Sequence, residues 1–297
     1  MIPVVTKPLI IKGTTQLLGV IGYPVKHSMS PTMHNRAIAA LGLDYVYLPF
    51  PIAPEHLKTA VDGFAAIGVR GFNITIPHKQ AIIPLLDEVS AVAEAIGAVN
   101  TVGWSERGWC GTNTDALGFM APLKSLERDW TQIPTLILGS GGAARAVVAA
   151  CYQLGCPEIW VAGRSADKLA AFAKSWQTSP LQPNMSVYSM DSLDGLLPQA
   201  GLVVNATPVG MAPQDMSPLS LEQIARLPGQ AIVYDLIYTP RPTRLLQRAA
   251  EIGLTAIDGL EMLVQQGAAA LEIWTQKPPP VAVMRQALLE RLAHPGG

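Results

Sequence analysis

Clusters of hydroxyl, amide and charged side chains follow several β-rich runs in the first half of the chain. They are Ser28-Met-Ser30-Pro31 with His34 and Asn35, Asn73 to Lys79, Asn100-Thr101, and Gly111-Thr-Asn-Thr-Asp115. Proteins of the α/β class bind ligands where strands end. Hydroxyl and amide groups at such places suit a ligand that carries hydroxyls and a carboxylate. Composition alone equally allows helix caps and turn residues, with Ser30 as an N-cap before Pro31.

A glycine-rich turn in the second half predicts a dinucleotide site. The apolar run 135–139 ends in Gly139-Ser140-Gly141-Gly142-Ala143-Ala144, and residues 145–154 then have helical composition up to Gly155. The first glycine permits a tight turn, the second lets the backbone approach a pyrophosphate, and amides at the helix N-terminus hold the phosphates. A plain turn is the alternative, but the position between strand and helix favours the dinucleotide.

The next β-rich run ends in Gly163-Arg164-Ser165, with Lys168 three residues later. Proteins that bind NAD usually place an acidic residue here against the ribose 2′-hydroxyl, and this chain has none at that point. A guanidinium can instead grip a 2′-phosphate, and the serine and lysine add a donor and charge. The cluster therefore favours NADP. The alternative is that Arg164 is an ordinary solvated arginine in a turn.

Strands and helices alternate in two series, which predicts an α/β fold. In the first series we expect strands at 17–22, 45–50, 71–76 and 100–104, with helices at 31–41 and 54–67. The second series predicts a doubly wound sheet, with strands at 135–139, 158–163, 186–190, 202–206 and 231–237. We expect a surface loop at 176–184 and helices over 260–292 with a break at 278–280.

Length and charge narrow the function classes. A chain of 297 residues predicts two domains. With 21 Lys and Arg against 22 Asp and Glu, the net charge of -1 offers no basic stripe for nucleic acid or an anionic membrane. No apolar run suits a membrane span, and Lys7 and Lys12 argue against a secretory signal. We expect a cytoplasmic protein with a small-molecule partner, and we leave a homodimer open.

Cysteines and histidines give no metal or disulfide pattern. Cys110, Cys151 and Cys156 form no CxxC pair, which argues against a disulfide framework and a zinc site. The other candidate metal ligands are His27, His34 and His78. Their spacing matches no zinc-binding pair on a helix. We therefore expect no metal.

Several motifs together resemble the shikimate dehydrogenase family. In the first half they are Gly22-Tyr-Pro-Val-Lys-His-Ser-Met-Ser-Pro-Thr-Met-His-Asn35, Gly71-Phe-Asn-Ile-Thr-Ile-Pro-His-Lys79, Ile96-Gly-Ala-Val-Asn-Thr101 and Gly111-Thr-Asn-Thr-Asp115. Further along they are Asn205-Ala-Thr-Pro-Val-Gly-Met211, Tyr234-Asp-Leu-Ile-Tyr238 with Pro240 and Thr243, and Asp258-Gly259-Leu-Glu-Met-Leu-Val-Gln-Gln266. The resemblance runs from about residue 17 to about residue 275 in the family's order.

The resemblance implies NADP-dependent reduction of a ketone, with Lys79 as the catalytic acid/base paired with Asp115. Chemistry agrees, because an ammonium group beside the carbonyl can donate the proton and stabilise the developing negative charge. The implied substrate residues are Ser28, Ser30, Thr75, Asn100, Asp115, Tyr238 and Gln266. The implied cofactor residues are Gly139, Ser140, Gly141, Gly142, Ala143, Gly163, Arg164, Ser165, Lys168, Thr207, Leu236 and Gly259. An isolated lysine after Pro77 would more often be an ordinary solvated residue.

The same resemblance implies how the domains are built. Residues 1–117 and 256–297 would form the substrate domain, in which the terminal helices return, and 118–255 a Rossmann-like cofactor domain, with the active site in the cleft between them. Two positions depart from the family pattern: Gly163 stands where asparagine is common, and Ala91 where some members have an acidic residue. These departures concern cofactor contacts rather than the reaction.

Two rival functions remain compatible with the fold. A quinate/shikimate dehydrogenase would tolerate an extra ring hydroxyl and often use NAD, which the Arg164, Ser165 and Lys168 cluster disfavours. A non-catalytic NADP-binding sensor would keep the fold and lose the chemistry, and the intact Lys79 and Asp115 disfavour it.

Overall fold

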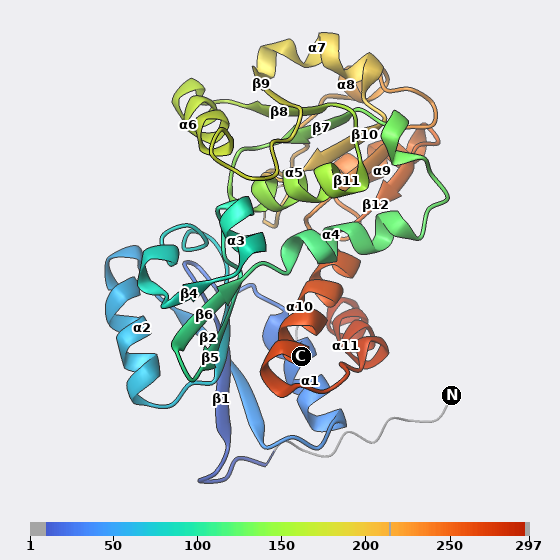
Figure 1. Cartoon of the computed structure of the whole chain (residues 1–297). Helices are drawn as coiled ribbons and strands as arrows, with labels where there is room; N and C mark the ends of the chain where they lie inside the picture. The colour runs from blue at the N-terminus through green and yellow to red at the C-terminus, as the bar shows by residue number, and fades with distance from the viewer. Residues whose placement is uncertain (1–9, 214, 295–297) are drawn as a thin grey trace. The chain divides into compact units, whose positions relative to one another are not determined.

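The computed structural model describes residues 10–213 and 215–294 (Figure 1). Within them the chain divides into two compact units. Unit 1 contains the chain up to Glu94, Ala98–Thr114 and the segment from Leu263, and unit 2 contains Ala95–Gly97 and Asp115–Met262. Residues 1–9 and 295–297, which belong to the expected substrate domain, lie outside the described residues. The first of these ranges includes Lys7. Over the described part of the chain, no helix combines the length and apolar character needed to cross a bilayer.

Unit 1 is built on a mixed sheet. Its strands are β1 Gln16–Gly22, β2 Tyr45–Pro51, β3 Gly71–Ile74, β4 Glu88–Val89, β5 Thr101–Ser105 and β6 Gly108–Thr112, in the order β2-β1-β3-β5-β6-β4. β1 is parallel to β2 and β3, whereas β5 is antiparallel to β3 and β6. Strands β4 and β6 were not predicted from the sequence. In β6 two glycines interrupt the apolar alternation by which a strand is recognised.

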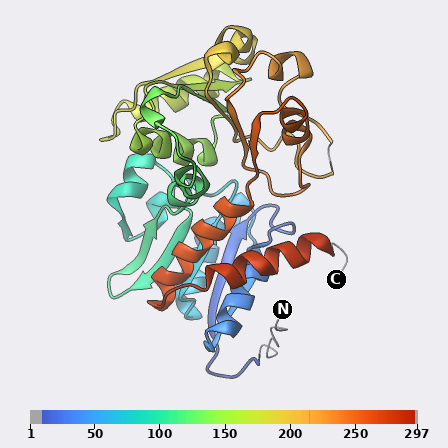
Figure 2. The ribbon, with the colours of Figure 1, turned by 90° about the vertical axis from the view of Figure 1, so that its right-hand side faces the viewer.

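Helices cover both faces of the unit 1 sheet (Figure 1). They are α1 Ser30–Ala40, α2 Leu57–Ala66, α3 Ala91–Ile96, α10 Leu260–Thr275 and α11 Val281–Ala293. The last two residues of α3 and the first turn of α10 belong to unit 2. Apolar residues of α2, among them Phe64, pack against Phe72 of β3 on one face. Figure 2 shows the two C-terminal helices crossing the other face, where Trp274 donates its indole proton to the Val102 carbonyl (2.9 Å). Gly71 leaves room for this ring, because a Cβ at that position would overlap the indole of Trp274.

Unit 2 is a doubly wound parallel sheet, as predicted. Its strands are β7 Thr135–Leu138, β8 Ile159–Gly163, β9 Met185–Ser189, β10 Leu202–Asn205, β11 Ile232–Asp235 and β12 Thr255–Ile257, in the order β12-β11-β10-β7-β8-β9. Its helices are α4 Asp115–Lys124, α5 Gly142–Leu154, α6 Ala166–Trp176, α7 Leu193–Leu196, α8 Leu221–Ile224 and α9 Arg244–Glu251. The order reverses between β7 and β10, and ligands of such sheets bind outside the carboxyl ends of the strands at this point. The α/β fold class is confirmed.

The core of unit 1 contains a histidine without a hydrogen-bond partner. Among the described residues neither ring nitrogen of His34 has one, and the side chain is fully buried. The ring stacks on Tyr47 with centroids 4.2 Å apart and lies near Trp274. Burial disfavours the charged imidazolium and lowers the pKa of His34 from 6.5 to about 3.

We expect this histidine to make unit 1 sensitive to acid. The unfolded chain binds the proton near pH 6.5 and the folded chain only near pH 3, so stability is full above 6.5 and falls as the pH drops towards 3. The loss is about 1.4 kcal/mol per pH unit, or about 2 kcal/mol between pH 7 and 5. Chemical denaturation of the wild type and His34→Phe across this range should show this difference in slope. His56→Gln, at an exposed histidine of the same unit, is the control, and parallel curves for wild type and His34→Phe would refute the prediction.

Candidate active site

The candidate substrate residues of unit 1 gather where β3 ends and β5 begins. Because β5 runs antiparallel to β3, Asn73 pairs with Thr101 across the two strands. This register places Asn100 beside the end of β3, and the N–H of Ile74 donates to the Asn100 carbonyl (2.8 Å). Thr75 follows directly on the chain. Two predicted substrate residues, Thr75 and Asn100, are thus brought to one edge of the sheet.

A buried tyrosine joins this edge to helix α1. Tyr47 donates its hydroxyl proton to Oδ1 of Asn73 (2.7 Å), and it is also hydrogen-bonded to Ser30. Nδ2 of Asn73 donates to the Asn100 carbonyl (3.2 Å) and to the Thr101 hydroxyl (3.1 Å). A carbonyl can meet the amide of Asn73 only at its nitrogen, so Oδ1 must face Tyr47. The direction of the hydrogen bonds is therefore fixed.

Helix α1 begins at Ser30, and the alternative interpretation of Ser30 as its N-cap is wrong. Met29 occupies the cap position and makes no side-chain cap hydrogen bond. The Ser30 side chain is instead engaged with Tyr47, and its N–H donates to the Ser28 hydroxyl (3.3 Å). The tertiary contact has replaced the local cap, and the separate hydrogen bond from the Ser30 N–H holds two predicted substrate residues, Ser28 and Ser30, together.

The side chain of Asn100 reaches the C-terminal helix α10. Its Nδ2 donates to Oε1 of Gln266 (3.3 Å) and to the Thr114 hydroxyl (3.0 Å), and its Oδ1 accepts the Thr114 N–H (2.8 Å). Gln266 in turn donates to the Leu263 carbonyl (2.8 Å). Asn100 and Gln266 are 166 residues apart in sequence and meet directly within unit 1.

Lys79 stands in a turn whose backbone is tied to the same edge. The N–H of His78 donates to the Thr75 carbonyl (3.0 Å), and the buried His78 ring is hydrogen-bonded to a backbone carbonyl. The carbonyl of Lys79 accepts the N–H of Val99 (2.8 Å), one residue before Asn100. The backbone that carries the candidate acid is therefore anchored beside a candidate substrate residue. Throughout the described residues, no group of three or more His, Cys, Asp or Glu could hold a metal ion.

Two further predicted substrate residues belong to unit 2. Asp115 is the first residue of α4 and is 5% exposed. The positive end of the helix dipole stabilises a carboxylate at this position. Tyr238 lies three residues beyond the end of β11 and is half-buried.

The glycine turn of unit 2 has the conformation that a pyrophosphate requires. Gly139 adopts φ +104°, a conformation that other residues rarely take, and closes the turn after β7. A side chain added at Gly141 would meet open space, so the backbone there is accessible. Helix α5 begins at Gly142, and its first amides face this turn. Ser140 and Ala143 are partly exposed in the same turn. These residues fit the phosphates of a dinucleotide.

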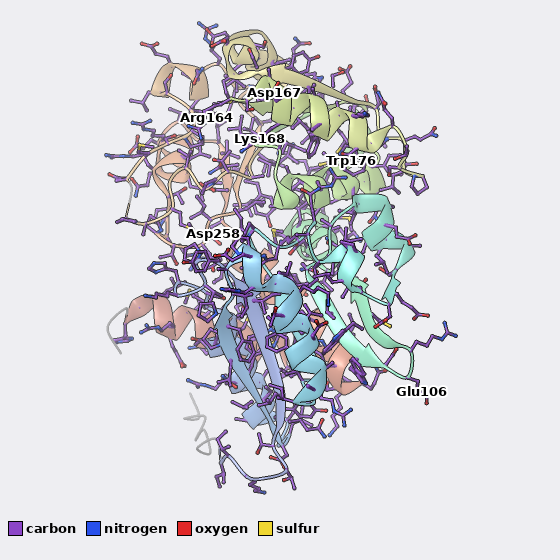
Figure 3. All side chains as sticks on the ribbon, turned by 90° about the vertical axis from the view of Figure 1, so that its left-hand side faces the viewer. Glu106, Arg164, Asp167, Lys168, Trp176 and Asp258 are labelled. Atoms are coloured by element: carbon purple, nitrogen blue, oxygen red, sulfur yellow. The ribbon has the colours of Figure 1, made fainter. Side chains whose placement is uncertain are left out.

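The residues expected to meet the 2′-phosphate lie at the start of α6 (Figure 3). Gly163 ends β8, and Ser165 caps α6 by accepting the N–H of Lys168 (3.4 Å). Arg164 and Lys168 are exposed, and so is Asp167 in the first helical turn. Two cations and one carboxylate give a net positive helix end, which suits an anion.

The other cofactor candidates lie at the ends of β10 and β11. A side chain added at Gly139 would approach Thr207 within 2.9 Å, so Thr207 packs on the glycine turn. Gly259 abuts the Leu236 carbonyl and donates its N–H to the Ile237 carbonyl (3.2 Å). The three candidates outside the glycine-rich segments are thus gathered at the carboxyl edge of the sheet.

Sequence reasoning did not single out Tyr47 or Asp235, and it named Asn73 only as the start of a polar cluster. Asn73 and Asp235 lay inside quoted motifs, and a polar residue at the end of an apolar run was the available signal. Tyr47 gave none, because a tyrosine in a strand is ordinary.

Comparisons with known proteins show which family the chain belongs to. Residues 20–102 match the model of the shikimate dehydrogenase substrate binding domain, and residues 259–289 that of the shikimate 5'-dehydrogenase C-terminal domain. A relative from Trichormus variabilis, named shikimate dehydrogenase (NADP(+)), is 62% identical over 95% of this chain and 99% of its own length. The chain belongs to the shikimate dehydrogenase family. The predicted family membership is confirmed.

Solved structures of the shikimate dehydrogenase family and its neighbours share the fold. A crystal structure of a shikimate dehydrogenase in complex with NADP+ has a TM-score of 0.87 and 38% identity, over 96% of this chain and 99% of that one. A quinate dehydrogenase from Corynebacterium glutamicum in complex with NAD has a TM-score of 0.84 and 31% identity, over 93% of this chain and 99% of that one. The fold is common to both, so it does not by itself select the substrate.

We expect Tyr47→Phe to destabilise unit 1. The change leaves Oδ1 of Asn73 as a buried acceptor without its donor, at a cost of about 1–3 kcal/mol. Calorimetric melting should detect the loss. Tyr45→Phe, at a half-buried tyrosine of the same strand, is the matched control and should have a much smaller effect. Equal melting temperatures for the two variants would mean that the hydroxyl of Tyr47 contributes nothing.

Proposed function

We propose that this protein is an NADP-dependent shikimate dehydrogenase that reversibly reduces 3-dehydroshikimate to shikimate, a step of the shikimate pathway to chorismate and the aromatic amino acids. The observation that carries the proposal is the anchoring of the Lys79 backbone next to Asn100, whose amide meets Gln266. Family membership and the curated relatives named for this NADP-dependent activity support it.

The residues of each unit then have distinct tasks. The hydroxyls and carboxylate of the substrate would be bound by Ser28, Ser30, Thr75, Asn100, Asp115, Tyr238 and Gln266. The glycine turn would hold the pyrophosphate, and Arg164, Ser165 and Lys168 the 2′-phosphate. Thr207, Leu236 and Gly259 would contact the cofactor at the ends of β10 and β11.

The reaction requires a hydride at the carbonyl carbon and a proton at the carbonyl oxygen. NADPH supplies the hydride. Lys79 would donate its ammonium proton to the oxygen as the negative charge develops there, and in the reverse direction neutral Lys79 would take the proton from the hydroxyl. Asp115 would orient the ammonium group and stabilise its charge. Atoms and charges balance without a metal.

One assay separates this function from its rivals. Steady-state rates should be measured with shikimate and with quinate, each with NADP and with NAD. We expect the highest kcat/KM for shikimate with NADP. Comparable rates on quinate with NAD would identify a quinate/shikimate dehydrogenase instead. NADP binding without turnover of either substrate would identify a sensor. The cytoplasmic location and the homodimer stay predictions from the sequence.

Lys79→Ala should abolish most turnover while leaving NADP binding intact. The substitution removes the proton donor, and general acid catalysis contributes about 10²–10⁴-fold to rates. NADP affinity depends on unit 2, to which Lys79 does not belong. Turnover should be measured together with NADP affinity and the circular dichroism spectrum. A folded variant with near-normal kcat would remove Lys79 from the mechanism.

Arg164→Ala should weaken the preference for NADP over NAD. Loss of a charge-assisted contact costs about 1.5–3 kcal/mol, which corresponds to roughly tenfold to a hundredfold in affinity. The measurement is the KM of both cofactors at fixed ionic strength, because salt screens phosphate contacts. Lys174→Ala, which removes a cation at the far end of α6, is the control. An equal rise of both constants in Arg164→Ala would mean that the arginine does not read the 2′-phosphate.

A further inference from the structure

Asp235 is a carboxylate in the interior of unit 2, at the end of β11. Its side chain is fully buried. The groups that hydrogen-bond to it are neutral donors: Nδ2 of Asn205 (2.9 Å) and the N–H of Ile237 (3.1 Å) at Oδ1, and the hydroxyl of Thr243 (2.7 Å) at Oδ2. A buried charge costs stability when no opposite charge accompanies it. Stability alone therefore does not account for an acid at this position.

The donors come from separate segments of unit 2. Asn205 ends β10, Ile237 lies in the turn after β11, and Thr243 is the N-cap of α9 and accepts the N–H of Leu246 (3.4 Å). One carboxylate thus fastens two strand ends and a helix start. A carboxylate can only accept, so each of these groups must point its proton inward.

This constraint sets the direction of the Asn205 amide. Its nitrogen donates to Asp235 and to the Val209 carbonyl (3.0 Å), so its oxygen faces Thr207. That oxygen accepts both the N–H of Thr207 (3.1 Å) and its hydroxyl proton (2.7 Å). The Thr207 oxygen accepts the N–H of Val209 (3.1 Å). The orientation of the Thr207 hydroxyl therefore follows from Asn205, whose nitrogen Asp235 holds together with the Val209 carbonyl.

The fastened segments are those that carry the cofactor candidates of the sheet edge. Thr207 packs on Gly139 of the glycine turn, and the Leu236 carbonyl abuts Gly259. Leu236 itself donates its N–H to the Asn205 carbonyl (3.1 Å). The network lies directly beneath the carboxyl ends of β10 and β11, beside the point where the strand order reverses.

We infer that Asp235 is a positioning residue for the cofactor: its buried carboxylate fixes Asn205, and through it Thr207 and the turn at Leu236, in the arrangement that binds NADP. The inference rests on the proposed function for the assignment of Thr207 and Leu236 to the cofactor. Asp235 itself contacts neither cofactor nor substrate in this account.

The charge of this carboxylate changes in an accessible pH range. Burial raises the pKa of Asp235 from 3.8 to about 6. The hydrogen bonds from Thr243, Ile237 and Asn205 lower the pKa, whereas the nearby Asp258, itself paired with Arg241, raises it. Because the pKa of Asp235 is higher in the folded protein than in the unfolded chain, the contribution of Asp235 to the stability of unit 2 is full below pH 3.8 and is lost as the pH rises through 6. A protonated carboxyl keeps Oδ1 as the acceptor for Asn205 and Ile237 and can donate its proton from Oδ2 to the Thr243 hydroxyl, as the amide of Asp235→Asn would. Acid should therefore preserve the network while it stabilises unit 2.

Direct binding of NADP by isothermal titration calorimetry tests the inference in the free protein, without substrate. Asp235→Ala should weaken NADP binding by about tenfold, the equivalent of one lost buried hydrogen bond. Asp235→Asn can still accept from Asn205 and Ile237 at its oxygen and donate to Thr243, so it should bind within about threefold of wild type at pH 8. Asp191→Ala, at an exposed aspartate of unit 2, is the control and should bind normally.

The pH dependence distinguishes positioning from stability. The cofactor's own phosphate titrates near pH 6, so the ratio of wild-type to Asp235→Asn affinities is the readout. We expect this ratio to stay within about threefold between about pH 8 and about pH 5.5, because the protonated carboxyl makes the same hydrogen bonds as the amide of Asp235→Asn. Asp235→Asn should also melt at a higher temperature than wild type near pH 8. Normal NADP binding by Asp235→Ala overturns the inference, as does a ratio that changes by more than about threefold across this range, and the second result remains decisive if the alanine variant does not fold. Failure of the proposed function would instead appear as NADP binding without shikimate oxidation.

Discussion

A polar atom that folding removes from water favours a partner inside the protein, because an unpaired donor or acceptor costs about 1–3 kcal/mol. Both units solve this at their strand ends with asparagine side chains. Asn73 and Asn100 do so in unit 1, and Asn205 in unit 2. An amide donates at one atom and accepts at the other, so each asparagine passes a fixed direction to its neighbours. The loops that carry the candidate site depend on these directions.

The two networks differ in charge, and this gives the units different responses to acid. In unit 1 the chain from Ser30 through Tyr47 to Asn73 consists of neutral groups. The acid-sensitive group there is His34, whose ring is kept neutral by burial against Tyr47. In unit 2 the network ends on a carboxylate, Asp235. Lowering the pH therefore destabilises unit 1 through its histidine, while in unit 2 the same change neutralises a charge whose burial is unfavourable.

The sequence was informative where a short segment determines its own structure. The turn at Gly139 was predictable because only glycine takes its conformation readily, and the parallel sheet because strands and helices alternate with the right spacing. Contacts between distant segments were not predictable in this way. Ser30 before a proline reads as a cap, yet its side chain turns to Tyr47, which no local pattern indicates. The family resemblance implied that Asn100 and Gln266 both bind the substrate, but only the structure shows that their side chains meet.

The same constraint bears on how such a site selects its ligand. An apolar pocket discriminates weakly between molecules that differ by one group, whereas a site of directed donors and acceptors strongly rejects a ligand that leaves one of them unpaired. Asn100 and Gln266 hold each other in place, so neither amide can turn to suit a differently substituted ring without breaking their contact. Asn100 is further held by Thr114 at both its oxygen and its nitrogen. Under the proposed function, the hydrogen bonds that stabilise this edge of unit 1 would thus also restrict which hydroxylated rings it binds, and a change in substrate preference would have to alter the network beneath the site as well as the residues that touch the ring.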